Sequence, residues 1–399
     1  MVSARIKEVS PSLTLGITAQ VKKMENEGIR VIGFTAGEPD FDTPENIKEK
    51  AKESIDKGFT KYTPSSGIRE LKEAICEKFK RDNHLEYRPE EIIVSCGAKQ
   101  AIFNALFTLC DEGDEVILPS PYWLSYPEMI KLVGGKAVII KTGSENNFKI
   151  TPQDLEKAIT KRTCLLILNS PANPTGMVYQ KEELAEIAEI LIQHKLWCIS
   201  DEIYEKLIYD DREHVSIASL GKEIKERTLV VNGVSKTYAM TGWRIGYCAG
   251  PKEVIQAMSN LQDHTTSNPT SISQMAALEA LTGNQETLKR MRDEFKERRD
   301  YMVEVINSLP YLKTLKPQGA FYCWVDISGA LGKIMENKKI ENSLAFTEAL
   351  LQSVYVAVIP GEPFGDEKHI RLSYATGREK IKEGLARIEK FLLGLRLTK

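Results

Sequence analysis

The chain has 399 residues, of which 42% are hydrophobic and 28% are charged, as is ordinary for a globular enzyme. Its formal net charge of −2 at pH 7 gives no electrostatic basis for binding nucleic acid or an anionic membrane. The length exceeds that of one small core, so we expect two domains, or one large and one small. Residues 1–10 lack the apolar core of a signal peptide and no apolar run could span a bilayer, so no membrane partner is expected.

The first 30 or so residues precede the predicted sheet and could form an arm or part of a small domain. From about residue 45 to 290, short apolar strands alternate with helical periodicity. Most of these strands are continuous apolar runs, which is typical of a sheet covered by helices on both faces. The pattern predicts an α/β fold with a largely parallel sheet, its strands at 91–95, 115–118, 136–140, 164–169, 196–200, 228–232 and 244–249, with helices such as 99–110 and 181–194 between them.

A long charged helix at 284–308, ended by Leu309-Pro310, marks a change of composition. Beyond it the sequence predicts a smaller α+β unit, with strands at 320–325, 354–359 and 369–374 and helices at 343–352 and 378–393. We therefore expect three segments: 1–44 as an arm and part of the small domain, 45–290 as the large domain, and 291–399 as the small domain.

The cysteines and histidines show no ligand spacing. Seven cysteines are dispersed without a Cys-x-x-Cys pair, which indicates reduced core residues in a cytoplasmic protein. The five histidines form no His-x-x-x-His pair and no mixed cluster. We therefore expect no metal site and no histidine-based nucleophilic triad.

Lys236 is the first candidate for chemistry. It follows the predicted strand 228–232, and Arg244 lies two helical turns further on. A primary amine in this place could anchor an aldehyde cofactor covalently, with the arginine holding the phosphate of that cofactor. Such a lysine reacts only when it is unprotonated, so burial and nearby positive charge must lower its pKa. Alternatively, Lys236 is a solvated residue that opens a loop.

A second candidate is the turn Cys96-Gly97-Ala98-Lys99 between a strand and a helix. Ligands of open α/β sheets bind beyond the carboxyl ends of the strands. Backbone N–H groups at the start of a helix could cradle a phosphate there, with Gly97 allowing close approach. The chain has neither the Gly-x-x-x-x-Gly-Lys loop nor a Gly-x-Gly-x-x-Gly fingerprint before a helix, which weighs against a nicotinamide dehydrogenase.

Three more candidates follow strands. Asp201 and, one turn later, Tyr204 come after the strand 196–200, and a buried carboxylate there could partner a pyridinium cation; the alternative is a helix N-cap. Asn173 lies in a turn after the strand 164–169 and would stand near Asp201 if the two strands are neighbours. Trp123 offers an aromatic face for a pyridine ring, or is simply packed in the core.

Taken together, the motifs resemble the class I pyridoxal-phosphate-dependent aminotransferases, and within them the prokaryotic-type aspartate aminotransferases. The resemblance covers residues 35–374 and rests on Gly37-Glu38-Pro39-Asp40, Asn173-Pro174-Thr175-Gly176, Ser200-Asp201-Glu202-Ile203-Tyr204, Ser235-Lys236 and Gly242-Trp243-Arg244, with 35–43, 61–67, 125–128 and 371–376 pointing to the subgroup. It implies fold type I, which has a large domain with a mostly parallel seven-stranded sheet between helices and a smaller α+β domain.

The resemblance also implies roles toward the cofactor, pyridoxal 5'-phosphate. Lys236 would bond to its aldehyde and later move a proton. Asp201 would hold the pyridinium nitrogen, Tyr204 and Asn173 would bond its phenolate oxygen, and Trp123 would stack on its ring. The residues expected to hold its phosphate are Gly97, Ala98, Lys99, Ser235, Arg244 and, from the partner subunit of a homodimer with shared active sites, Tyr62.

On the substrate side, the resemblance implies that Arg371 pairs bidentately with the α-carboxylate, assisted by Asn173 and the backbone of Gly37. Taken alone, Arg371 could be an exposed strand arginine. Thr14 and Lys99 occupy positions that the resemblance links to prephenate, although a lysine present in some relatives is Ser10 here. The bonds Ser120-Pro121 and Asn173-Pro174 are expected to be cis.

These inferences predict transamination in two half-reactions between L-aspartate and 2-oxoglutarate, with prephenate as a possible further acceptor. The open alternatives are an aromatic or other amino-acid aminotransferase and a carbon–sulfur lyase of the same fold. A transcription regulator with an aminotransferase-like domain needs a DNA-binding domain ahead of Gly37, for which this chain offers no room. The exact donor and acceptor and the pathway are not predicted.

Overall fold

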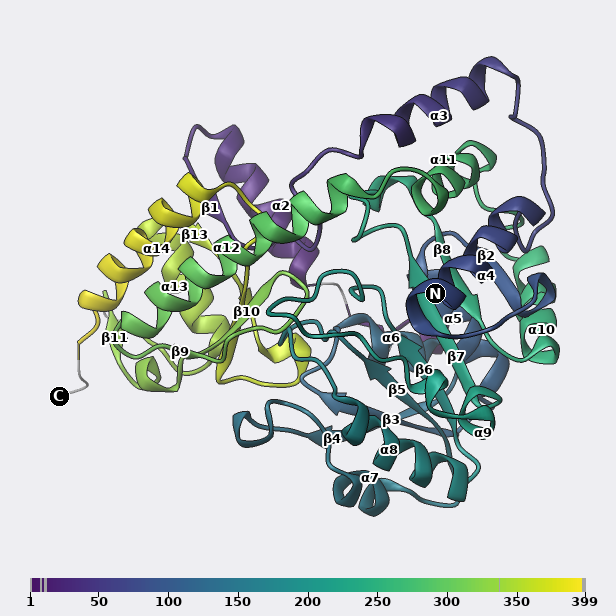
Figure 1. Ribbon diagram of the computed structural model, residues 1–399. Helices are drawn as coiled ribbons and strands as arrows, with labels where there is room; N and C mark the ends of the chain where they lie inside the picture. The colour runs from purple at the N-terminus through teal and green to yellow at the C-terminus, as the bar shows by residue number, and fades with distance from the viewer. Residues whose placement is uncertain (1, 8, 11–12, 337, 397–399) are drawn as a thin grey trace.

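A computed structural model of the chain describes residues 2–7, 9–10, 13–336 and 338–396. Its centre is a seven-stranded sheet in the order β2-β8-β7-β6-β5-β3-β4 (Figure 1). Only β8 runs against its neighbours, so the carboxyl ends of the other six strands lie at one edge. The strands are β2 (Ile92–Ser95), β3 (Glu115–Ser120), β4 (Lys136–Lys141), β5 (Thr163–Asn169), β6 (Trp197–Asp201), β7 (Thr228–Gly233) and β8 (Gly246–Ala249). The predicted fold class is confirmed.

Helices cover both faces of this sheet, as the continuous apolar strands predicted. Within β7, Val230 packs into one buried cluster, while Leu229 and Val231 pack into another on the opposite face. One side carries α3 (Glu45–Asp56), α4 (Arg69–Asn83), α7 (Pro152–Ala158), α8 (Lys181–Gln193), α9 (Lys222–Lys225) and α11 (Ser271–Thr282), and the other α5 (Ala98–Leu109), α6 (Ser125–Leu132) and α10 (Lys252–Asp263). Strands buried on two sides need apolar residues at every position.

A second unit is built on a four-stranded antiparallel sheet in the order β14-β15-β10-β9. Its strands are β9 (Lys313–Thr314), β10 (Tyr322–Asp326), β14 (Ile359–Pro360) and β15 (His369–Ser373). The helices α12 (Glu286–Ser308), α13 (Ser343–Val354) and α14 (Arg378–Leu393) gather on this side of the molecule in Figure 1. The short strand β11 (Ile334–Met335) pairs in antiparallel with β12 (Lys338–Lys339).

Two predicted strands differ from those observed. The run 354–359 is not one strand but two, because β13 (Val356–Ala357) pairs in parallel with β1 (Ile32–Gly33) whereas β14 pairs with β15. The N-terminal segment thus joins the second unit through β1, after α1 (Ala4–Lys7) and α2 (Leu13–Asn26). The predicted strand 244–249 begins only at Gly246, because Arg244 has a left-handed backbone, with φ of 55°.

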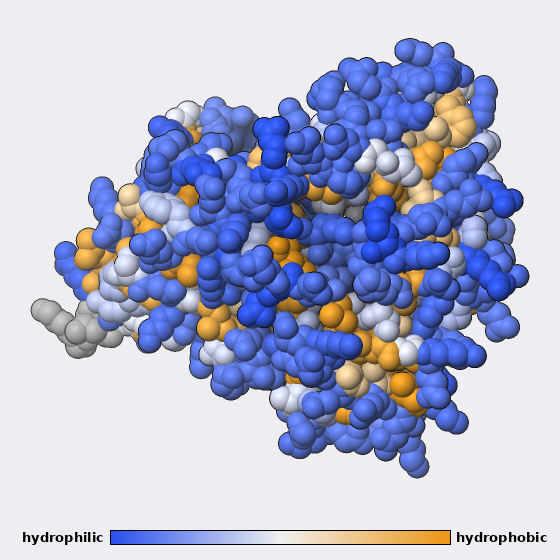
Figure 2. Space-filling model, in the orientation of Figure 1, coloured by the Kyte–Doolittle hydropathy of each residue, from blue (hydrophilic) through white to orange (hydrophobic). Residues whose placement is uncertain are grey.

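The face of the molecule shown in Figure 2 is mostly hydrophilic, with small apolar patches between charged side chains. Within the described part of the chain, no helix is both long enough and apolar enough to cross a membrane.

Candidate active site

A cavity of about 430 Å³ opens beyond the carboxyl ends of the strands. Its lining brings together nearly all the predicted site residues: Gly37, Ala98, Lys99, Trp123, Asn173, Asp201, Tyr204, Ser235, Lys236, Arg244 and Arg371. They come from sequence positions more than 300 residues apart and from both sheets. The cavity therefore lies where ligands of open α/β sheets bind.

Lys236 follows β7 and extends into this cavity, where its Nζ donates a hydrogen bond to the carbonyl oxygen of Gly37 at 2.6 Å. Burial lowers the pKa of Lys236 to about 8, and the positive charges of Arg371 and Arg244 act in the same direction. The carboxylates of Glu38 and Asp201 oppose this shift of the pKa. A larger fraction of this amine is therefore unprotonated at neutral pH than of an ordinary lysine.

Asp201 ends β6, is 4% exposed and accepts hydrogen bonds from the Tyr126 hydroxyl at 2.7 Å and the Ile203 amide at 3.2 Å. Burial raises the pKa of Asp201 to about 6, although both hydrogen bonds lower it. The helix-cap alternative is wrong, because turns rather than a helix follow β6. Tyr126 was not predicted as a site residue, although it lies in the segment 125–128 that carries the resemblance.

Asn173 and Arg371 meet at the other side of the cavity. The strands β5 and β6 are neighbours, as required for Asn173 to approach Asp201. Arg371 Nη1 donates to Asn173 Oδ1 at 3.1 Å, and Nη2 donates to the carbonyl oxygen of Thr35 at 3.0 Å. Arg371 is only 3% exposed, so the exposed-arginine alternative is wrong. Its buried Nε has no hydrogen-bond partner among the described residues.

Tyr204 is fully enclosed, and its hydroxyl lies 2.8 Å from that of Tyr322 on β10. The aromatic ring of Tyr322 in turn lies 4.4 Å from the guanidinium carbon of Arg371. Tyr322 also lines the cavity, yet it was not predicted, because in the sequence it is one aromatic residue within a buried strand.

The turn at Gly97, which was predicted as a phosphate cradle, leads directly into a helix as expected. Gly97 precedes α5 with φ of 90°, a conformation that favours glycine. A Cβ atom on Gly97 would lie 2.4 Å from Arg244 Nη2, so only glycine leaves room for this guanidinium. Arg244 is held there by the carbonyl oxygens of Thr241, at 2.8 Å, and Cys96, at 3.3 Å. Lys99 Nζ lies 4.9 Å from the centre of a Trp123 ring.

Of the predicted residues whose side chains are described, Gly97 and Tyr62 do not line this cavity. Tyr62 is 92% exposed in the single chain. Thr14 lies in α2, but its side chain is outside the described part of the structure. The Ser120-Pro121 and Asn173-Pro174 bonds are both cis, as predicted, and Ser170-Pro171, which was not predicted, is cis as well.

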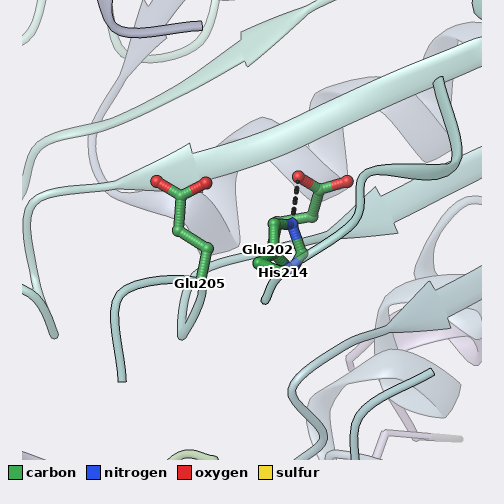
Figure 3. Close-up of side chains that lie close together, drawn as sticks. All are labelled: Glu202, Glu205 and His214. Atoms are coloured by element: carbon green, nitrogen blue, oxygen red, sulfur yellow. Dashed lines mark hydrogen bonds and ion pairs between the residues drawn. The ribbon is translucent and has the colours of Figure 1, made fainter. Parts of the chain in front are cut away.

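The residue after Asp201, Glu202, belongs to a buried cluster that the sequence did not reveal. One oxygen each of Glu202 and Glu205 and one ring nitrogen of His214 lie within 4.8 Å of one another (Figure 3). Glu202 accepts hydrogen bonds from Ser200, Ser216 and His214, while Glu205 contacts Lys78 and Asn83. The Lys78 ammonium thus places a buried positive charge beside Glu205.

Lys78→Met should therefore destabilise the protein by about 3–5 kcal/mol, because it leaves Glu205 buried without its cation. Urea unfolding monitored by circular dichroism would measure this loss. Lys48→Met, which breaks a surface ion pair with Glu45, is the matched control and should cost less than about 1 kcal/mol. Equal losses in the two variants would show that the buried ion pair contributes no more to the free energy of unfolding than the surface ion pair.

Comparison with known proteins now identifies the family. A model of the family "Aminotransferase class I and II" matches residues 29–388. An aspartate aminotransferase of Bacillus sp. strain YM-2 is 50% identical over 392 residues, which is 98% of this chain and 99% of that protein. An aspartate/prephenate aminotransferase of Cereibacter sphaeroides is 49% identical over 98% of this chain and 99% of that protein. The structure of Thermus thermophilus aspartate aminotransferase with maleate has a TM-score of 0.93 at 44% identity, covering 98% and 100% of the two chains.

The fold and the site define an enzyme that uses pyridoxal 5'-phosphate to transfer amino groups. The chain belongs to the class I and II aminotransferases. The predictions of family, fold type, enzyme class and cofactor are therefore confirmed.

The residues of the cavity fit this cofactor. Asp201 is a buried carboxylate for which no ion pair is found within the described residues, so a pyridinium nitrogen would supply the missing cation. The Gly97 turn and Arg244 leave space and charge for a phosphate at the start of α5. Lys236 lies between these two ends with the amine that an aldehyde requires.

The lowered pKa of Lys236 gives a pH prediction. We expect the rate at which the cofactor-free protein combines with pyridoxal 5'-phosphate to rise with pH, with a midpoint at about pH 8, where half of the Lys236 amine is unprotonated, and to level off above this pH. Stopped-flow absorbance would follow this reaction. A rate still rising steeply above pH 9 would show that Lys236 keeps the pKa of an ordinary lysine.

Proposed function

We propose that this chain is an aspartate aminotransferase, which converts L-aspartate and 2-oxoglutarate to oxaloacetate and L-glutamate. One observation carries the proposal: among the described residues, four basic side chains but a single carboxylate line the cavity, namely Lys99, Lys236, Arg244 and Arg371 against Asp201. A phosphate and a dicarboxylic substrate together balance this charge, whereas a neutral amino acid does not. The names of the relatives, and maleate in the Thermus structure, support a dicarboxylic substrate.

In this proposal the substrate is bound by its α-carboxylate at Arg371. The guanidinium is oriented by Asn173 and by the carbonyl oxygen of Thr35, and its burial strengthens the pairing. The backbone of Gly37 closes the same side of the cavity, where it also accepts the hydrogen bond of Lys236. The substrate's α-carbon would therefore be presented to the Lys236 amine.

The cofactor, when bound, supplies an electron sink that stabilises negative charge at the substrate's α-carbon. The side chains of this enzyme provide orientation and proton transfer. Asp201 would keep the ring nitrogen protonated, Tyr204 and Asn173 would donate hydrogen bonds to the ring oxygen, and Trp123 would cover the ring. Ser235, Arg244 and the backbone of the turn at Gly97, Ala98 and Lys99 would hold the phosphate. Lys236 takes the proton from the α-carbon and returns it on the cofactor side.

The proposal includes a homodimer in which Tyr62 of each subunit completes the phosphate site of the other. Its 92% exposure in the single chain supports this role. We further propose the domain boundaries 1–44, 45–290 and 291–399. A cytoplasmic location is also proposed, because the seven cysteines are free thiols even where Cys110 and Cys164 lie 3.5 Å apart.

A panel of amino donors, each tested with 2-oxoglutarate and with oxaloacetate, tests the proposed specificity. We expect kcat/KM to be highest for aspartate with 2-oxoglutarate and for glutamate with oxaloacetate. Preference for an aromatic or aliphatic donor would contradict the assignment. Prephenate belongs in the same panel as an acceptor, since some relatives are named aspartate/prephenate aminotransferases.

The variant Lys99→Ala tests whether Lys99 binds the distal carboxylate of the substrate. Burial lowers the pKa of Lys99, and the charge of Arg244 does so further, yet its amine faces the cavity from the start of α5. We expect the KM for aspartate to rise about 10-fold or more, with a much smaller change for alanine, because one charged hydrogen bond contributes about 1.5–3 kcal/mol. An equal loss for both donors would assign Lys99 to the cofactor phosphate instead. Thr14→Ala should show the same selectivity if Thr14 also contacts the substrate.

A further inference from the structure

Tyr322 connects the two halves of the cavity. It lies on β10 of the four-stranded sheet, while Tyr204 follows β6 of the seven-stranded sheet. Their hydroxyl oxygens are 2.8 Å apart and both side chains are buried. On its other side, the Tyr322 ring lies under the guanidinium of Arg371, 4.4 Å from its central carbon. A continuous contact therefore runs from Arg371 to Tyr204.

We propose that Tyr322 is a positioning residue that couples substrate binding at Arg371 to the hydrogen bond that Tyr204 offers the cofactor. This inference rests on the proposed function, in which Arg371 binds the substrate α-carboxylate.

The charges around the shared hydrogen bond differ between its two hydroxyls. Arg371 contacts the Tyr322 ring, whereas the Asp201 carboxylate acts on Tyr204. Burial raises the pKa of both phenols and the charge of Arg371 lowers the pKa of both, while Asp201 adds to the rise for Tyr204. In this proposal Tyr322 donates the shared hydrogen bond to the Tyr204 oxygen, a direction that the 2.8 Å between the two hydroxyls allows. The proton of Tyr204 is then free to point into the cavity.

Carboxylate binding changes this arrangement. An anion that binds Arg371 neutralises the guanidinium charge next to the Tyr322 ring and draws the guanidinium toward itself. Tyr322 then becomes a weaker donor, and the hydrogen bond from Tyr204 to the cofactor changes in strength. Beside the hydrogen bond from Arg371 to Asn173, this contact offers a second route by which the site senses an occupied carboxylate subsite.

Tyr322→Phe tests the coupling, because it keeps the ring under Arg371 and removes only the hydroxyl. Maleate is the probe, since a dicarboxylate without an amino or oxo group binds without reacting. The visible absorption of the holoenzyme is titrated against pH with and without saturating maleate. We expect maleate to shift the midpoint in the wild type, and we expect the shift in Tyr322→Phe to be less than about half as large.

Tyr374→Phe is the matched control, because it removes another buried hydroxyl, one that donates to the carbonyl oxygen of Ala320 at 3.2 Å. This control should keep the full shift. Tyr204→Phe should lose at least as much of the shift as Tyr322→Phe, because it removes both this contact and the hydrogen bond to the cofactor, and the double variant should lose no more than Tyr204→Phe. If Tyr322→Phe does not fold, a full shift in Tyr204→Phe still overturns the coupling, because the contact from Arg371 ends at Tyr204.

The possible results distinguish failure of the proposed function from failure of the coupling role of Tyr322. A wild type whose transamination of aspartate is not inhibited by maleate contradicts the proposed function, because Arg371 then binds no dicarboxylate, whereas inhibition without a shift of the titration overturns the coupling alone. A wild-type response that persists in full in Tyr322→Phe overturns the coupling role of Tyr322 and leaves the proposed function intact.

Discussion

Lys236→Ala is expected to abolish transamination, with kcat reduced on the order of 10⁴-fold or more, while the fold is retained. The loss is large because one amine both anchors the cofactor and transfers the proton, and general acid–base catalysis alone contributes up to about 10⁴-fold. Sodium borohydride should fix the cofactor permanently to the wild-type protein. Peptide mapping by mass spectrometry should then find the added mass on the peptide that contains Lys236.

Lys222→Ala provides the control, since Lys222 is an exposed lysine at the start of the surface helix α9. It should keep both the activity and the borohydride label. A label on another lysine in the wild-type protein, or an undiminished label in Lys236→Ala, would disprove the assignment of the anchor. Thermal melting of the variants in cofactor-free form would confirm that the loss is chemical.

Asp201→Ala should reduce kcat by on the order of 10²–10³-fold, the range observed when one preorganised electrostatic group is removed. Without this carboxylate the ring nitrogen of the cofactor is not kept protonated and the ring becomes a poor electron sink. Steady-state assays with aspartate and 2-oxoglutarate would measure the effect. Near-normal turnover would mean that Asp201 has only a structural role.

Asp201→Asn separates charge from shape and checks the fold. Burial raises the pKa of Asp201 to about 6, so its stabilising contribution is present below its ordinary pKa and is lost as the pH rises through 6. At pH 8 the ionised carboxylate therefore opposes folding of the cofactor-free protein. We expect Asp201→Asn to melt no lower than the wild type at this pH and to lose activity as Asp201→Ala does.

Much of the large domain could be predicted because its strands are buried on both faces. Continuous apolar runs predicted the strands that end at Asn169, Asp201 and Gly233. Polar residues at and after the ends of these runs indicated the edge of the sheet where the cavity forms. The helix at 378–393 was predicted with its observed bounds, because Gly377 and Gly394 flank a clear periodic pattern.

Other features depend on contacts that a sequence pattern does not contain. The run 354–359 is divided because its two halves pair with different strands, one of them from the N-terminal segment. Tyr126 and Tyr322 look like ordinary core residues, and their partners Asp201 and Tyr204 lie 75 and 118 positions away. The buried cluster with Lys78 could not be predicted for the same reason. Hydrophobic periodicity shows which face of a helix or strand is buried, but not which residues pack against that face.

A single-turnover experiment tests the central claim most directly. Holoenzyme without any oxo acid is mixed with excess L-aspartate, and oxaloacetate, pyruvate and ammonia are measured. A transaminase should form roughly one oxaloacetate per bound cofactor, release no ammonia and stop, because the amino group stays on the enzyme until an oxo acid removes it. Continued release of ammonia would contradict transamination and favour a lyase of the same fold.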